Sequence, residues 1–269
     1  MRRANQKSDS WERHHILGHA SKANPCILER TGYGGKTGKE GLSGWSAVHH
    51  NTASELFSMA TVVIGGHSRD VGKTSVVAGL ISALAEFHWT ALKITQYGHG
   101  ICAADGASCD CATADHSFAI SEEKDRSGAS DSSRFLIAGA DQAFWVRTEQ
   151  GRLAEAMPTV RRIVASAQNV IIESNSIIKF FRPDLYLSVL DPDTADFKSS
   201  AREFMDRADA IIVHRAKAAK PQWQGVSLKP AARKPTFQIQ PPNYVTPEII
   251  DFVRKQLVAA QVSDSNTSR

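Results

Sequence analysis

Hydrophobic and polar positions follow two alternating patterns from residue 60 onward. Short runs of β-branched and aliphatic residues predict strands at 61–66, 90–95, 142–147, 169–174, 185–190, 209–214 and 236–240. Apolar residues at helical spacing predict helices at 73–87, at 131–139, within 152–167, at 198–207 and at 247–258. This alternation predicts an α/β fold, a doubly wound and mostly parallel sheet with helices on both faces. Ligands of such sheets bind beyond the carboxyl ends of the strands.

Residues 1–58 lack this periodicity and are rich in Gly, Ser, Lys, Asn and His. Such a segment buries too little apolar surface to offset its ordering entropy, which predicts a disordered extension. The alternative is that the chain naturally begins at Met59 and that the upstream residues are non-native. We therefore expect a domain at 59–260 and a tail at 261–269, with 96–130 as a long irregular stretch inside the domain.

A glycine-bounded loop between the first predicted strand and helix carries the strongest chemical signal. The run Thr61–Ile64 leads into a loop that ends in Gly72-Lys73-Thr74 and continues into an apolar helix. Strand, glycine-rich loop and helix in this order are typical of a P-loop, whose N–H groups and helix dipole hold phosphates. Lys73 is expected to reach the β/γ oxygens, and the Thr74 hydroxyl to ligate Mg²⁺. The predicted nucleotide-binding residues of this segment are Gly66, His67, Ser68, Arg69, Val71, Gly72, Lys73, Thr74 and Ser75.

Charged residues where other predicted strands end are further candidates. Lys93 stands near the end of strand 90–95, where it can reach a phosphate or a carboxylate, or remain a solvated lysine. Glu173 ends strand 169–174, and a carboxylate beside a P-loop is placed to hold Mg²⁺. Asp70, inside the loop, is the candidate to orient water or substrate. Asp70, Lys73 and Lys93 are therefore the predicted catalytic residues.

Two phrases resemble known protein families. The loop reads G-x5-GKT from Gly66, which resembles dethiobiotin synthetase and its relatives in the SIMIBI class of P-loop proteins. Residues 131–140, DSSRFLIAGA, form a capped helix with a small-residue turn and resemble the D-S-x-R-x-x-x-A-G-A phrase of MobB, the adaptor of molybdopterin-guanine dinucleotide biosynthesis. The second resemblance implies that Asp131, Ser132 and Arg134 face the nucleotide or its acceptor.

These resemblances imply a Mg²⁺-dependent nucleoside triphosphate-binding protein with slow hydrolysis, an accessory factor in molybdenum-cofactor maturation. An alternative is an ATP-dependent carboxylate or carbamate ligase of the dethiobiotin synthetase type, in which Lys93 stabilises the carboxylate. The guanine-reading motif Asn-Lys-x-Asp is absent after strand 209–214, so ATP and GTP both remain open. A partner enzyme of cofactor biosynthesis and a homodimer are further expectations drawn from the resemblance.

Three cysteines gather in the irregular stretch, where Cys102, Cys109 and Cys111 lie near His99 and His116. Three thiolates with the imidazole of His99 or His116 can form a closed tetrahedral Zn²⁺ site, for which His116 is the candidate ligand. A cysteine-ligated Fe–S cluster is another possibility, although a fourth thiolate is missing. The alternative is a set of loose thiols, because the spacing matches no common zinc signature. A bound metal would favour a third function, nucleotide-gated metal binding or delivery.

Composition narrows the choice of cellular compartment and of binding partner. No apolar run approaches the ~20 residues that span a bilayer, and Arg2 and Arg3 are not followed by an apolar secretory core. The cysteines are too closely clustered for a disulfide framework, which predicts a cytoplasmic protein. The formal net charge is +4, but the sequence contains no zinc-finger spacing, RNA-recognition signature or long basic run. We therefore predict no nucleic-acid or membrane partner.

Overall fold

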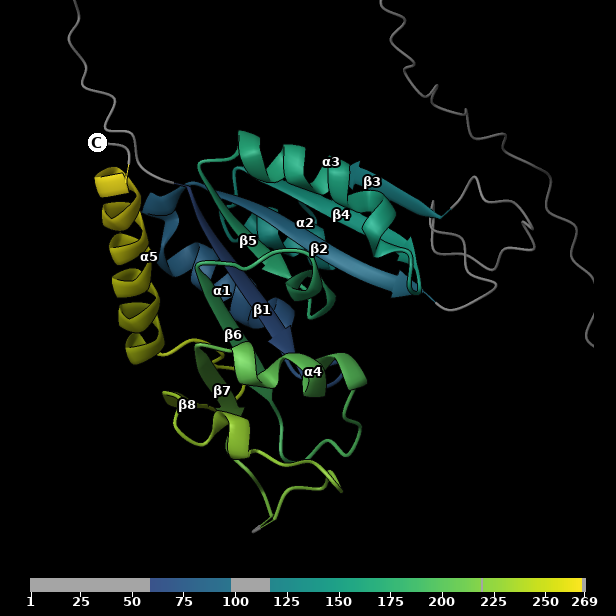
Figure 1. Cartoon of the computed structure of the whole chain (residues 1–269), viewed down its shortest axis with the longest axis vertical. Helices are drawn as coiled ribbons and strands as arrows, with labels where there is room; N and C mark the ends of the chain where they lie inside the picture. The colour runs from purple at the N-terminus through teal and green to yellow at the C-terminus, as the bar shows by residue number, and fades with distance from the viewer. Residues whose placement is uncertain (1–58, 98–116, 219, 268–269) are drawn as a thin grey trace, which may run out of the picture. The chain divides into compact units, whose positions relative to one another are not determined.

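A computed structural model describes residues 59–97, 117–218 and 220–267, with side chains up to residue 260. In these ranges one sheet has the strand order β3-β4-β2-β5-β1-β6-β7-β8 (Figure 1). The strands are β1 (Ala60–Gly66), β2 (Trp89–Tyr97), β3 (Phe118–Glu122), β4 (Gln142–Glu149), β5 (Asn169–Glu173), β6 (Leu185–Leu190), β7 (Ala210–His214) and β8 (Thr236–Ile239). Only β3 pairs antiparallel in this sheet, with β4, and every other neighbouring pair is parallel.

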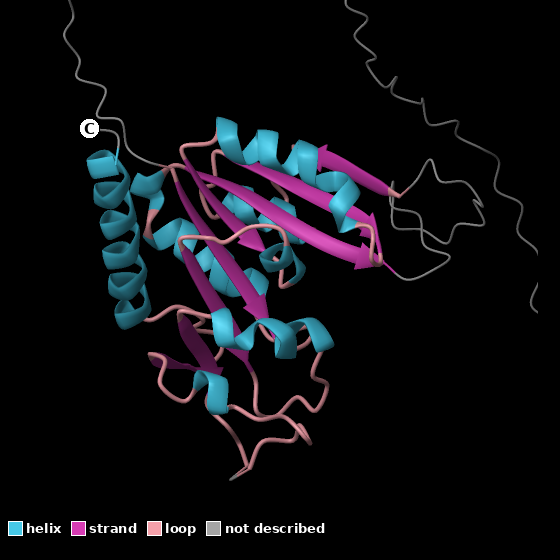
Figure 2. Cartoon of the chain, viewed as in Figure 1, coloured by secondary structure: helices cyan, strands magenta, loops and turns pink. Residues whose placement is uncertain are grey.

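Helices cover both faces of the sheet (Figure 2). They are α1 (Lys73–Ala83), α2 (Asp131–Ile137), α3 (Leu153–Ser166), α4 (Ser199–Phe204) and α5 (Pro247–Thr267). Buried residues of α1, α2 and α5 pack in one hydrophobic cluster, and those of α3 and α4 pack in the other. The predicted doubly wound, mostly parallel α/β fold is therefore confirmed.

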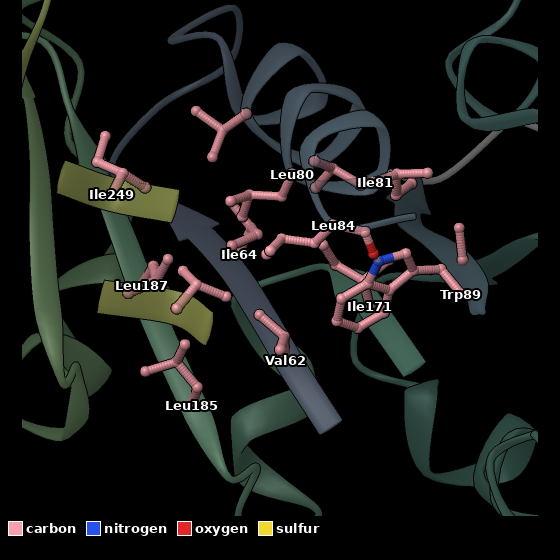
Figure 3. Packing of buried hydrophobic residues seen from close by; sticks show 14 of the residues in the cluster. Val62, Ile64, Leu80, Ile81, Leu84, Trp89, Ile171, Leu185, Leu187 and Ile249 are labelled. Atoms are coloured by element: carbon pink, nitrogen blue, oxygen red, sulfur yellow. Dashed lines mark hydrogen bonds between the residues drawn. The ribbon is translucent and has the colours of Figure 1, made fainter. Parts of the chain in front are cut away.

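The alternation of side chains along β1 explains why both faces are apolar. Val62 and Ile64 point into the cluster of α1, whereas Val63 points into the cluster of α3. Figure 3 shows Leu80 and Ile81 of α1 over the first of these faces, with the Trp89 indole N–H bonded to the Leu84 carbonyl at 2.8 Å. The strand that leads to the loop before α1 is thus fixed by packing on both sides.

The structure departs from the predicted elements in several places. β3 lies within the stretch predicted to be irregular, because a short edge strand with half-buried side chains depends on pairing with β4 rather than on its own pattern. α1 ends at Ala83 and a 3₁₀ turn, Ala85–Phe87, completes the predicted helix. α5 continues to Thr267, into the predicted tail.

Some predictions lie outside the described residues. These include the disordered or non-native extension at 1–58 and the cysteine stretch. Within the ranges that the structure describes, no helix combines the length and apolarity required to cross a bilayer.

Candidate functional site

The candidate site lies at the carboxyl edge of the sheet, where β1 passes into the loop before α1. The loop turns twice through left-handed backbone, at Asp70 (φ 54°) and Gly72 (φ 83°). The first helical hydrogen bond of α1 runs from the Val76 N–H to the Gly72 carbonyl at 2.9 Å. The N–H groups of residues 73–75 therefore have no acceptor within the helix, and they provide donors for an anion at its N-terminus.

The side chain of Lys73 is folded back over the loop. Its ammonium donates a hydrogen bond to the Ser68 carbonyl at 2.6 Å. Gly66 makes this approach possible, since a Cβ there would lie 2.9 Å from the Lys73 side chain. Burial lowers the pKa of Lys73 to about 8, although the nearby Glu173 carboxylate acts to raise it. A half-buried ammonium in a loop of free N–H groups favours binding of an anion.

A second set of charged groups adjoins Lys73 at the ends of β2 and β5. Parallel register places Lys93 beside Glu173, and Glu173 beside Ile64 of β1. The Glu173 carboxylate is buried, accepts a hydrogen bond from the Thr74 hydroxyl at 2.8 Å and forms an ion pair with Lys93. The Lys93 ammonium also lies 2.8 Å from Asp131, at the start of α2. This charge compensation explains how Glu173 stays buried beside the loop.

Thr74 and Glu173 fit the role of magnesium ligands. A hydroxyl and a carboxylate oxygen 2.8 Å apart, at the N-terminus of α1, are the hard oxygen donors that Mg²⁺ takes. In the described part of the chain no group of three or more His, Cys, Asp or Glu side chains could hold a metal by itself. Cys102, Cys109, Cys111 and His116 lie outside the described residues.

His67 anchors the loop instead of facing a ligand. Its ring accepts a hydrogen bond from the Asp191 N–H at Nε2, so Nδ1 carries the proton and donates to the Asp196 carbonyl. Its backbone N–H donates to Val189, and the ring packs against Phe197 and Trp223. Burial lowers the pKa of His67, in keeping with a neutral ring. Because both ring nitrogens and the backbone N–H of His67 form hydrogen bonds within the protein, we correct the prediction that His67 contacts the nucleotide.

Two contacts that the sequence patterns did not reveal hold the same end of the loop. The Asn175 side chain donates to the Gly66 carbonyl and accepts from the Gly66 N–H, both at 2.8 Å. The Ser68 hydroxyl donates to the Asp196 carboxylate at 2.6 Å. Asn175 closely follows Glu173, but only the parallel pairing of β1 with β5 places it opposite Gly66.

The predicted residues of α2 separate into two groups. The Ser132 hydroxyl is buried and donates to Glu123 at 2.7 Å, so the prediction that Ser132 faces a ligand is wrong. Arg134 donates to the Ser75 hydroxyl at 3.1 Å, and Asp131 holds Lys93, so both lie at the site. α2 thus turns Asp131 and Arg134 toward the loop and its serines into the protein.

A cavity of about 500 Å³ opens beside Ser75. It lies along α1 between Arg134 and the loop that precedes α5, and Asn243, Tyr244 and Val245 form its far wall. The Tyr244 ring presses on the phosphate loop, since a Cβ at Gly72 would lie 2.3 Å from it. His214 packs against Tyr244 and hydrogen-bonds the Val71 carbonyl at 3.0 Å. Val71 itself is buried in the core, whereas Arg69 and Asp70 are exposed.

A strand, a loop that ends in Gly-Lys-Thr and a helix with free N–H groups, set in a doubly wound sheet, define an α/β protein with a P-loop fold. No family model and no curated protein matches the chain. Among solved structures, LpxK from Aquifex aeolicus in complex with ATP aligns at 17% identity and TM-score 0.38, over 67% of this chain and 53% of that one. The chain therefore spans about half the length of that protein.

Two further solved structures align at a similar level. HypB from Helicobacter pylori in complex with nickel is 12% identical over 76% of this chain and 88% of that one, with a TM-score of 0.42. Bacillus subtilis MobB is 16% identical over 72% and 96%, with a TM-score of 0.28. Likenesses at this level carry no argument about function, which we base on the site residues.

Proposed function

We propose that this chain is a Mg²⁺-dependent nucleoside triphosphate-binding protein that hydrolyses its ligand slowly. The observation that carries the proposal is the convergence of Lys73, Thr74 and buried Glu173 at the N-terminus of α1. Lys73 supplies a cation for the phosphates, and Thr74 and Glu173 supply a hydroxyl and a carboxylate for the Mg²⁺ that accompanies a triphosphate.

In this proposal the free N–H groups of the loop hold the phosphates, and Lys73 exchanges its bond to the Ser68 carbonyl for phosphate oxygens. Thr74 and Glu173 would hold Mg²⁺, which would neutralise phosphate charge. Asp70, exposed at the rim of the loop, remains the candidate to orient the attacking water. The cavity beside Ser75 is the candidate place for the nucleoside, with Tyr244 and Arg134 at its walls.

The biological role that we propose is that of an accessory factor in molybdenum-cofactor maturation. Its support is the phrase at 131–140, whose Asp131 and Arg134 both lie at the site. A partner enzyme of that biosynthesis follows from the same proposal. The base is left open between ATP and GTP, because the guanine-reading Asn-Lys-x-Asp motif is absent after β7.

The second candidate is a ligase that phosphorylates a carboxylate or carbamate. The observation that favours it is the Lys93 ammonium, which lies between the carboxylates of Asp131 and Glu173 at the rim of the crevice. A ligase would show negligible hydrolysis until a carboxylate substrate is added. Turnover of nucleotide alone would favour the slow NTPase.

The experiment that tests nucleotide binding is calorimetric titration of the full chain with non-hydrolysable ATP and GTP analogues in Mg²⁺. We expect Lys73→Ala to reduce affinity at least 100-fold, since one charge-assisted contact to phosphate contributes roughly 3 kcal/mol. Lys229→Ala, at an exposed lysine of the β7–β8 connection, is the matched control. Retained affinity in a folded Lys73→Ala variant would remove the proposal.

A further inference from the structure

Lys198 is a cation of the site that the proposed function leaves without a role. It lies directly before α4, and Figure 1 shows α4 next to the end of β1. The Lys198 N–H donates to the His67 carbonyl at 2.8 Å, which ties this residue to the first turn of the phosphate loop. Lys198 therefore borders the loop on the β6 side, while Lys93 borders it on the β2 side.

The charges of these lysines act on one another around the loop. Lys93 and Lys198 both act to lower the pKa of Lys73, and Lys93 with Arg69 acts to lower that of Lys198. Burial is the larger cause of the lowered pKa of Lys198, which is half-buried. Four cations from three different segments of the chain thus lie near enough to repel one another, an arrangement that is unfavourable without an anion.

Two of these four cations have neither a directly paired carboxylate nor a role in the proposed nucleotide site. Lys93 is paired with Glu173 and Asp131, and Lys73 is assigned to the phosphates. Among the residues that the structure describes, no carboxylate lies within 4 Å of the Lys198 or Arg69 side-chain nitrogens. Asp196 and Asp70 attract Lys198 from farther away. The charge that Lys198 and Arg69 offer is therefore available to a ligand.

The direction that we propose for the nucleotide places that ligand. The nucleoside cavity adjoins Ser75, whereas Lys198 contacts the opposite end of the loop at His67. A triphosphate that extends from Ser75 across the loop brings its terminal phosphate toward Lys198 and Arg69. The side of the terminal phosphate that faces away from the nucleoside is where a second substrate would stand.

We propose that Lys198 and Arg69 form a second oxyanion subsite, which binds the phosphate or carboxylate group of an acceptor beside the terminal phosphate of the nucleotide. This inference rests on the proposed nucleotide site. It extends that proposal, because the site would bind two substrates, the nucleotide and the acceptor. Arg69 supplies a planar fork that suits a phosphate or carboxylate, and Lys198 supplies a point charge.

The test uses the full chain saturated with the non-hydrolysable triphosphate analogue and Mg²⁺, so that the terminal phosphate position is filled. Inorganic phosphate and, in a parallel arm, succinate are then titrated by calorimetry. We expect one equivalent of one of these anions to bind, and Lys198→Met to weaken that binding at least tenfold. Its effect on the affinity for the triphosphate analogue should stay below threefold.

Two variants keep the result interpretable. Lys198→Arg retains the charge and should keep anion affinity within threefold of the wild type, and Lys229→Met removes a distant lysine and should change neither affinity.

Binding of phosphate rather than succinate, or the reverse, identifies the acceptor group. The proposed subsite is overturned if the protein loaded with the analogue binds neither anion. It is also overturned if Lys198→Met reduces the affinity for the triphosphate analogue as strongly as the affinity for the anion, because Lys198 would then be a ligand of the terminal phosphate. Failure of the analogue to bind at all would instead remove the nucleotide proposal.

Discussion

At the scale of single residues, the site depends on buried charges that balance one another. Glu173 is almost fully buried, and its charge is offset by Lys93 and by the Thr74 hydroxyl. Lys73 has weaker compensation, a carbonyl and the more distant Glu173, so burial lowers its pKa to about 8. A phosphate would supply the missing negative charge, which links protonation of this lysine to ligand binding.

This linkage predicts a pH dependence of nucleotide affinity. Below pH 8 Lys73 is already charged in the free protein, so its contribution to affinity is fully present. Above pH 8 the lysine must take up a proton on binding, because phosphate oxygens raise its pKa. The affinity should therefore fall as pH rises through 8, approaching about tenfold per pH unit.

Calorimetry at pH 7, 8 and 9, in pairs of buffers with different protonation enthalpies, measures this proton uptake directly. Lys73→Arg provides the control, since a guanidinium stays charged throughout this range and should bind without uptake at this position. Equal proton uptake by the wild type and by Lys73→Arg at pH 9 would contradict the assignment of Lys73.

At the scale of elements, the phosphate loop is held from both sides by segments distant in sequence. On one side Asn175, after β5, forms two hydrogen bonds with Gly66. On the other side Tyr244, before α5, lies against Gly72 and is packed by His214 at the end of β7. The loop therefore has a defined conformation before any ligand binds, which reduces the entropy cost of binding.

The contact between Gly72 and Tyr244 predicts a difference between two glycine substitutions. Gly72 and Gly151 both have positive φ, at 83° and 89°, but a Cβ at Gly151 meets nothing within 4 Å. Gly151→Ala should cost about 1–2 kcal/mol of unfolding free energy from backbone strain alone. Gly72→Ala should cost at least about 1 kcal/mol more, because the Tyr244 ring must move.

Urea denaturation of both variants, and of the double variant with Tyr244→Ala, separates the two effects. Removal of the ring should recover part of the additional cost of Gly72→Ala, seen as a coupling energy in the double-mutant cycle. If Gly72→Ala proves no more destabilising than Gly151→Ala, the close contact with Tyr244 is not rigid.

At the scale of the whole molecule, the two hydrophobic clusters hold the sheet edge that carries the site. α5 belongs to the same cluster as α1 and β1, so the last helix supports the strand and the helix that flank the phosphate loop. Ile249, Val253 and Leu257 form its buried stripe. Loss of packing at α5 should therefore lower global stability, although α5 carries no predicted ligand contact beyond its first turn.

Adjacent residues of α5 provide a matched test of this support. Leu257 is completely buried, whereas Val258 is 49% exposed. Leu257→Ala should lower the free energy of unfolding by about 2–5 kcal/mol through lost burial and a residual cavity. Val258→Ala should change it by less than about 0.5 kcal/mol. Chemical denaturation compares the two, and a similar small effect at both positions would show that the stripe does not support the core.

Local patterns were sufficient to predict most of the elements and the centre of the candidate site. A buried strand, a Gly-Lys-Thr turn and an apolar helix carry their signals within adjacent residues, so the phosphate loop and Lys73 could be found without a fold. Parallel strands that end in Lys93 and Glu173 were also visible, because strand ends of one sheet share an edge. β3 was missed because its pairing with β4, not its own pattern, makes it a strand.

Tertiary structure alone decided how the remaining residues contribute. His67 belongs to the loop in sequence, but burial against Phe197 and Trp223 turns it into an anchor, and the contact with Glu123 does the same for Ser132. Asn175, Lys198 and Tyr244 reach the loop only because β5, β6 and the segment before α5 are brought around β1. Adjacent residues specify local backbone and periodicity, whereas the pairing of strands across more than a hundred residues decides which side chains meet.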